Sequence, residues 1–172
     1  MATTLIVYYS RTGNTKKIAT ALVSMMHADD LEVFDKKTRT GIFGWLTAGR
    51  DATFKKIGVI DAPKLDFSPY ELVVICTPVW AFTMATPIRT WLIYNGRELL
   101  TKKVAFVATM GGSGDKRAFF HMTQIMKKSP VCTATFLEKE IHQNAYEQKL
   151  SEFLLKIQTG TLIKTAKTVR KT

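Results

Sequence analysis

The sequence predicts an α/β fold with three layers, in which helices cover both faces of a doubly wound, five-stranded parallel sheet. Short apolar runs typical of strands alternate five times with segments of helical periodicity, a pattern that favours parallel strands joined by helices. The chain has 172 residues, of which 46% are hydrophobic and 23% are charged. A chain of this length can form one domain with a sizeable buried core. Since crossovers between parallel strands are right-handed, the sheet takes a doubly wound form, and ligands are expected beyond the carboxyl ends of its strands.

The first two strands and the helix between them are predicted near the N-terminus. Residues 4–9, TLIVYY, form a continuous apolar run typical of a strand that is buried on both faces. The spacing of apolar residues then predicts an amphipathic helix over residues 14–27. Residues 31–34, LEVF, predict a short second strand. We expect a helix over residues 41–57, although interior glycines weaken its pattern.

The central strand of the sheet is predicted at residues 71–77, ELVVICT, the most continuous apolar run of the chain. A helix follows the next loop and is expected to end near Gly96, because glycine commonly follows the last turn of a helix. The inward-facing residues of this helix are predicted to be Ile88, Trp91 and Leu92. Residues 103–109, KVAFVAT, predict a fourth, buried strand.

The last third of the chain is predicted to contain two helices and the fifth strand. The first of these helices carries on one face Phe119, Met122, Thr123 and Met126. Residues 131–138, VCTATFLE, predict the strand because they are rich in residues that favour strands. The final helix is expected to bury Leu150, Phe153, Leu154 and Ile157. We expect it to end at Gly160, so that residues 1–158 form the domain and residues 159–172 a basic C-terminal tail.

The chain is strongly basic. Its 25 Lys and Arg residues outnumber 14 Asp and Glu residues, which gives a formal net charge of +11. The positive charges that follow the last acidic residue, Glu152, are Lys156, Lys164, Lys167, Arg170 and Lys171. Two interpretations are open: a solvated surface, or attraction to an acidic protein or an anionic membrane surface. We do not expect a nucleic-acid partner, because the sequence has no zinc-finger, helix-turn-helix or RNP-like signature.

The sequence favours a soluble, cytoplasmic protein. No apolar run approaches the roughly 18 residues that cross a bilayer, and the N-terminal residues lack the basic leader and cleavage pattern of a secretory signal. Cys76 and Cys132 are expected to remain free thiols, as in a reducing compartment. The three histidines are scattered without the spacing of a metal site, so we expect no metal.

The loop after the first strand is rich in hydroxyl and amide side chains. It consists of Ser10, Arg11, Thr12, Gly13, Asn14 and Thr15. Backbone N–H groups at the start of the following helix, surrounded by such side chains, suit a phosphate group. An ordinary helix cap explains one of these residues but not a whole loop of them. The spacing matches neither the Walker A loop nor G-x-G-x-x-G, so the prediction of phosphate binding depends on the strand–loop–helix context.

Together with its strand, the S-R-T-G-N-T loop resembles the FMN-phosphate loop of the flavodoxin family, whose pattern is [ST]-x-T-G-N-T. The resemblance continues through T-P-V-W at residues 77–80 and A-T-M-G-G-S-G at residues 108–114, where the two flavin-ring loops of the family fall. It covers about residues 3–155. It implies a sheet with strand order 2-1-3-4-5 and an FMN cofactor at the switch point of that sheet.

By resemblance, the second and third loops line the flavin ring. They contribute Thr77, Pro78, Val79, Trp80, Ala81 and Phe82 from one loop, and Thr109, Gly111, Gly112 and Gly114 from the other. The alternatives are that Trp80 and Phe82 are core or interface aromatics, and that the glycines form a flexible loop. Relatives commonly carry Gly at the position of Phe82. Because Phe does not easily adopt φ > 0, we expect either that the loop backs away from the flavin or that the ring joins the flavin or substrate wall.

The resemblance implies that FMN carries the chemistry, so no catalytic side chain is assigned. We expect an FMN-dependent oxidoreductase that passes electrons or hydride from NAD(P)H or a redox partner protein to a quinone-like or other acceptor. The alternatives are a flavodoxin-type electron carrier without a small substrate of its own and a binding module that has lost FMN. Flavodoxins are usually acidic, so the net charge of +11 counts against an ordinary carrier. The intact phosphate loop counts against the loss of FMN.

Overall fold

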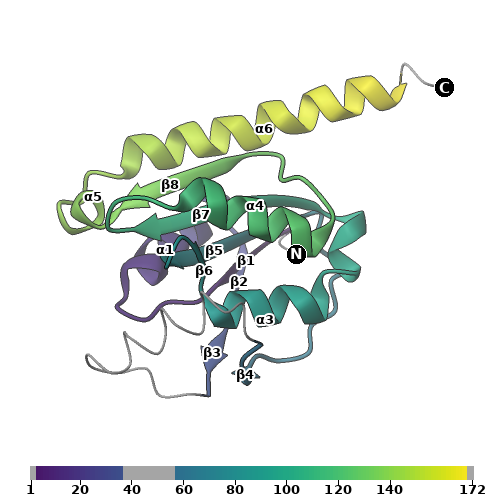
Figure 1. The fold of residues 1–172 in the computed structure, drawn as a ribbon. Helices are drawn as coiled ribbons and strands as arrows, with labels where there is room; N and C mark the ends of the chain where they lie inside the picture. The colour runs from purple at the N-terminus through teal and green to yellow at the C-terminus, as the bar shows by residue number, and fades with distance from the viewer. Residues whose placement is uncertain (1–2, 37–56, 170–172) are drawn as a thin grey trace.

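The computed structural model describes residues 3–36 and 57–169 of the chain, with side chains up to residue 159 (Figure 1). The helix expected over residues 41–57 therefore lies, apart from residue 57, outside the described part. Among the described residues, no helix combines the length and the apolar character needed to cross a membrane.

A parallel sheet forms the middle layer of the molecule. Its parallel strands are β1 (Thr4–Tyr8), β2 (Asp29–Glu32), β5 (Leu72–Trp80), β7 (Lys103–Met110) and β8 (Thr133–Leu137). They lie in the order β2-β1-β5-β7-β8, and every neighbouring pair along this path is parallel. Counted along the sequence this order is 2-1-3-4-5, so the predicted fold class and strand order are confirmed.

Helices cover both faces of the sheet, which gives the predicted three layers (Figure 1). One face packs against α3 (Thr86–Asn95) and α4 (Asp115–Met126). The other face packs against α1 (Asn14–Met26), α5 (Glu138–His142) and α6 (Glu147–Val169). A short 3₁₀ helix, η1 (Glu98–Thr101), links α3 to β7.

Alternate residues of each strand point to opposite helix layers. In β1, Leu5 and Val7 belong to the core under α3 and α4, whereas Ile6 and Tyr8 belong to the core under α1 and α6. Both faces of the central strands must therefore be apolar, which explains why these strands read as continuous apolar runs in the sequence. Cys76 in β5 is fully buried, and both cysteines are free thiols as expected.

Most of the residues predicted to face inward from the helices do so. Those that are buried are Ile88, Trp91, Leu92, Met122, Met126, Leu150, Phe153 and Ile157. Phe119, Thr123 and Leu154 are only partly buried. The helical periodicity of the sequence therefore identified the packed face of α3, α4 and α6. The residues predicted to be buried that are only partly buried lie at the margin of that face.

The second strand lies earlier in the chain than expected. β2 spans Asp29–Glu32 and not residues 31–34, and Leu31 is its only buried residue. Phe34–Asp35 form a separate strand, β3, which pairs antiparallel with β4 (Ile60–Asp61). Because β2 lies at the edge of the sheet, its remaining residues need not be apolar, and the apolar run in the sequence therefore gave the wrong boundaries.

The last helix extends further than expected. α6 continues to Val169, so the predicted helix end at Gly160 is wrong. A glycine inside a helix costs only about 1 kcal/mol relative to alanine, which good helix-forming neighbours can offset. The division into a domain over residues 1–158 and a basic tail over residues 159–172 stays a prediction.

The packing of α6 on the sheet can be tested with two residues of this helix. Phe153 is 1% exposed, whereas Leu155 is 60% exposed. We expect Phe153→Ala to lower the free energy of unfolding by about 3–5 kcal/mol, because it removes a large buried side chain. The control, Leu155→Ala, should change it by no more than about 0.5 kcal/mol. Urea denaturation measures both values, and equal effects would contradict the packing of α6.

Candidate functional site

The carboxyl ends of β5 and β7, together with the loops that follow β1 and β7, line a cavity of about 230 Å³ at one edge of the sheet. The predicted site residues that line it are Arg11, Thr12, Asn14, Thr15, Pro78, Val79, Trp80, Thr109 and Gly111. The predicted site residues outside this lining are Ser10, Gly13, Thr77, Ala81, Phe82, Gly112 and Gly114. The structure thus brings the three sequence motifs together, with part of each motif facing the cavity and part supporting it.

The first loop turns into α1 at Gly13, whose φ of +93° favours glycine. Its N–H donates to Ser10 Oγ at 3.1 Å, and its C=O accepts the N–H of Lys17 at 2.9 Å as the helix begins. No acidic residue lies in the first turn of α1. The other N–H groups at this helix start, together with the positive end of the helix dipole, therefore suit an anionic group.

A buried pair of hydroxyls joins the first loop to the end of β7. Thr15 Oγ1 lies 2.7 Å from Thr109 Oγ1, and either atom can donate the hydrogen bond. Each residue is 2% exposed, and both line the cavity. Because buried polar groups require partners, this bond fixes the start of α1 against the third loop.

Arg11 and Trp80 lie together at the wall of the cavity. The guanidinium carbon of Arg11 is 5.8 Å from the centroid of the Trp80 ring, within the range of a cation–π contact. Tyr9 packs edge-on against the same ring at 5.6 Å, so Trp80 is both a cavity residue and a neighbour of the core. Arg11 Nε is buried without a hydrogen-bond partner in the described structure. Such a donor beside a cavity suits an anionic ligand.

The second loop is a tight hairpin. β5 continues to Trp80, the chain turns through Ala81 and Phe82, and it returns antiparallel as β6 (Thr83–Met84). Ala81 has φ +45° and Phe82 has φ +60°, the signs of a type I′ turn. Phe82 therefore adopts the positive φ that is unfavourable for this residue type. The Phe82 side chain is 55% exposed and lies outside the cavity lining.

Gly114 allows the third loop to pack directly against this hairpin. A Cβ on Gly114 would lie 2.9 Å from Phe82 Cα and 3.0 Å from Val79 Cγ1. Gly114 also has φ +113°, which favours glycine. The close contact helps to hold Ala81 and Phe82 in left-handed conformations that cost roughly 1–2 kcal/mol each. Gly114 therefore supports the hairpin and does not line the cavity.

Thr77 also supports the hairpin. This residue is fully buried, and its hydroxyl donates to the C=O of Pro78 at 3.0 Å. The same oxygen accepts the N–H of Ala85 at 3.0 Å. Both bonds fix the backbone where the chain leaves β5 and enters α3, so the Thr77 side chain acts on the shape of the site and not on its surface.

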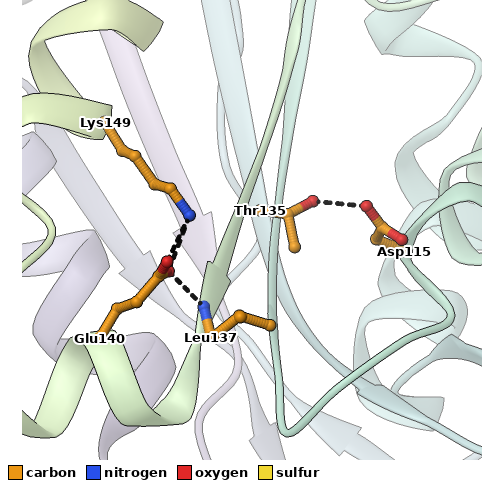
Figure 2. A network of polar contacts seen from close by, with 5 residues as sticks. All are labelled: Asp115, Thr135, Leu137, Glu140 and Lys149. Carbon is orange, nitrogen blue, oxygen red and sulfur yellow. Dashed lines mark hydrogen bonds and ion pairs between the residues drawn. The ribbon is translucent and has the colours of Figure 1, made fainter.

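Met110 and Glu138 line the cavity although the sequence analysis did not identify them. Glu138 follows β8, and a Cβ on Gly111 would lie 3.7 Å from Glu138 Oε2. β8 is held to the start of α4 by the Thr135 hydroxyl, which donates to the Asp115 carboxylate at 2.8 Å (Figure 2). The carboxyl ends of all parallel strands lie at the same edge of the sheet. This rule could have identified Glu138, which follows the fifth strand, as a candidate site residue.

A polar network fixes the start of α5, which places Glu138 at the cavity. The N–H of Leu137 donates to Glu140 Oε2 at 2.9 Å, and Lys149 Nζ lies 2.7 and 2.8 Å from the two Glu140 carboxylate oxygens (Figure 2). The hydrogen bond from Lys149, followed by that from Leu137, holds the pKa of Glu140 below its ordinary value. The first turn of α5 is thus anchored to α6.

The fold and the cavity define a doubly wound α/β protein with a cavity at the switch point of its sheet, lined by a loop whose chemistry suits an anion. The flavodoxin family model matches residues 3–153, and the chain belongs to the flavodoxin family. No curated protein sequence matches it. Among solved structures, a flavoprotein from Lactobacillus acidophilus in complex with FMN is 26% identical, with a TM-score of 0.68 over 83% of this chain and 98% of that chain. A Bacteroides eggerthii protein described as a flavoprotein shares the fold at 21% identity and a TM-score of 0.63, over 88% of this chain and 99% of that chain.

The contact between the second and third loops can be tested at two glycines. We expect Gly114→Ala to lower the free energy of unfolding by about 1–3 kcal/mol, because the added Cβ meets the Phe82 backbone at 2.9 Å and φ is positive. The control is Gly112→Ala, where a Cβ would meet nothing within 4 Å. Thermal or urea unfolding measures the difference, and an equal loss in both variants would contradict the proposed contact.

Proposed function

We propose that this protein binds FMN in the strand-end cavity and acts as an oxidoreductase, passing electrons or hydride from NAD(P)H or a reduced partner protein to a quinone-like acceptor. The observation that supports this most directly is the meeting of three flavodoxin-type motifs around one cavity, beside the unpartnered Nε of Arg11. Membership of the flavodoxin family and the FMN-bound relative from Lactobacillus acidophilus support the choice of cofactor.

The first loop holds the phosphate end of the cofactor. Backbone N–H groups at the start of α1, the Thr12 hydroxyl and the Asn14 amide offer hydrogen-bond donors at the cavity. Arg11 supplies the positive charge that a phosphate group requires. Thr15 keeps this loop in place through its bond to Thr109.

The second and third loops hold the ring system. Pro78, Val79 and Trp80 provide an apolar and aromatic wall, and the backbone from Thr109 to Gly111 provides polar groups at the cavity edge. When bound, FMN supplies the capacity to accept and release a hydride or two electrons. The cavity of about 230 Å³ is smaller than the roughly 300–1,000 Å³ typical of enclosing pockets, so part of the ring stays accessible to a second reactant.

The charge of the chain favours an enzyme over an ordinary electron carrier. A net charge of +11 is unlike that of the usual acidic flavodoxins, whose acidic faces dock on basic partners. The partner proposed for this charge is an acidic protein or an anionic membrane surface. The free thiols of Cys76 and Cys132 support a reducing compartment, and we place the protein in the cytoplasm.

The phosphate loop is tested by FMN titration of the double variant Thr12→Ala/Asn14→Ala. A hydrogen bond to a charged group contributes about 1.5–3 kcal/mol, so we expect the Kd for FMN to rise by roughly 100-fold or more. The titration follows the change in flavin fluorescence. Thr20→Ala, an exposed hydroxyl on the same helix, is the control variant. Riboflavin, which lacks the phosphate, should bind wild type and double variant alike. An unchanged Kd for FMN would contradict the assignment.

Turnover distinguishes the enzyme from the carrier. We expect the FMN-loaded protein to oxidise NADH or NADPH well above the rate of an equal concentration of free FMN when a benzoquinone is the acceptor. The spectrophotometric loss of the reduced nicotinamide measures this rate. Tight FMN binding without such acceleration, combined with rapid reduction by a flavodoxin reductase, would identify an electron carrier and reject the enzyme.

A further inference from the structure

A buried arginine that forms no ion pair with any described residue lies next to the second loop. Arg89 belongs to the first turn of α3, where its backbone N–H donates to the C=O of Ala85. The residue is only 4% exposed. Its Nη2 donates to Thr83 Oγ1 at 2.8 Å, while its Nε is buried without a hydrogen-bond partner. In the described part of the chain, no carboxylate forms an ion pair with this guanidinium.

The surroundings of Arg89 increase the positive potential at this point. The first turn of α3 contains no acidic residue, and its N-cap, Ala85, offers no side-chain acceptor. The positive end of the helix dipole therefore adds to the charge of Arg89. Thr86 Oγ1, one turn before Arg89, is also buried without a partner. Burial lowers the pKa of Arg89, but a guanidinium stays protonated at neutral pH.

Such an arrangement is costly for the protein alone. A buried cation normally gains an ion pair that offsets the loss of its hydration. Arg89 instead has one neutral partner, the Thr83 hydroxyl, whose oxygen also lies 2.8 Å from Nδ1 of His121. Arginine can only donate, so the Thr83 oxygen accepts from Arg89, and it forms a second hydrogen bond with His121 Nδ1 in which either atom can donate. Arg89 thus contributes a permanent positive charge to this network.

The position of Arg89 connects this charge with the cavity. Thr83, its hydrogen-bond partner, pairs with Trp80 across the β5–β6 hairpin. Trp80 in turn lines the cavity proposed to hold FMN. The guanidinium therefore contacts the hairpin that forms one wall of the site without itself lining the cavity. In a protein interior, where the effective dielectric constant is low, a unit charge acts well beyond its contact distance.

We propose that Arg89 stabilises negative charge on the flavin ring, so that the protein favours reduced over oxidised FMN. The inference rests on the proposed function and deepens it. Two electrons and one proton convert oxidised FMN into its reduced form with one additional negative charge on the ring. A cation that binds this form more tightly shifts the equilibrium toward reduction by the ratio of the two affinities. A protein that favours reduced FMN accepts hydride readily from a donor of the nicotinamide class. It is less suited to act as a strongly reducing electron carrier.

The test compares the affinities of both redox states in Arg89→Met. Titration gives the Kd of oxidised FMN, and equilibration of the bound cofactor with redox dyes under dithionite gives the Kd of reduced FMN through the thermodynamic cycle. We expect Arg89→Met to weaken the binding of reduced FMN by roughly tenfold more than that of oxidised FMN, as the loss of one buried charge predicts. Arg89→Lys, which keeps the charge, should retain most of the wild-type ratio.

A matched control removes an exposed charge from the same part of the fold. Arg97 lies just after α3 and is exposed, so Arg97→Met should leave the ratio of the two Kd values unchanged. Circular dichroism verifies folding, and Arg89→Gln replaces Arg89→Met if the latter does not fold. Equal weakening of both redox states, or no change in the ratio, would show that Arg89 has only a structural role and would overturn the inference. A wild-type protein that binds FMN in neither state would instead reject the proposed function, and the inference with it.

Discussion

The parallel pairing of β1, β5 and β7 is the constraint on which the rest of the structure depends. These strands are buried on both faces, so they occupy the centre of the sheet and point in one direction. Their register brings the strand ends to similar heights, as the pairing of Pro78 with Thr109 shows. The loops that follow must then lie side by side, although they come from distant parts of the chain. A binding site at this edge needs suitable residues in each loop but no special long-range arrangement.

The close approach of these loops explains their internal structure. Hydroxyl groups satisfy one another or the backbone where the loops meet, as Thr15 does with Thr109 and Thr77 with Pro78. The hairpin at Phe82 is strained, and the missing side chain of Gly114 provides the space in which it packs. Strain of this kind persists only where surrounding contacts over-determine the backbone. The contact between Gly114 and the hairpin therefore supports the conformation of this cavity wall.

The sequence predicted those features that depend on neighbouring residues. The central strands were predicted from continuous apolar runs. The role of the first loop was predicted from its own residues and from its position between a strand and a helix. The conformation of Phe82 could not be predicted in this way, because the contact that supports it comes from Gly114 in another loop. Glu138 was missed for a related reason: its neighbours in sequence are ordinary residues of a helix start, and only the geometry of the sheet edge places it at the cavity. The edge strand β2 needs few apolar residues, so its boundaries left little trace in the sequence.

The distribution of charge is more informative than the total. Most charged side chains of a basic protein face water, where salt screens them beyond about 10 Å. Burial removes this screening, so Arg89, at 4% exposure, influences its surroundings more than many exposed lysines. At the cavity itself Arg11 is accompanied by the carboxylate of Glu138, whereas no carboxylate among the described residues pairs with Arg89. The two arginines therefore differ in their electrostatic surroundings. A phosphate keeps its charge in both redox states of the cofactor, but the ring becomes negative only on reduction. On the proposal that FMN binds in this cavity, a buried cation that forms no ion pair with any described residue would act on the redox equilibrium and not merely on affinity, which would favour an enzyme that accepts hydride over a carrier that must release electrons at low potential.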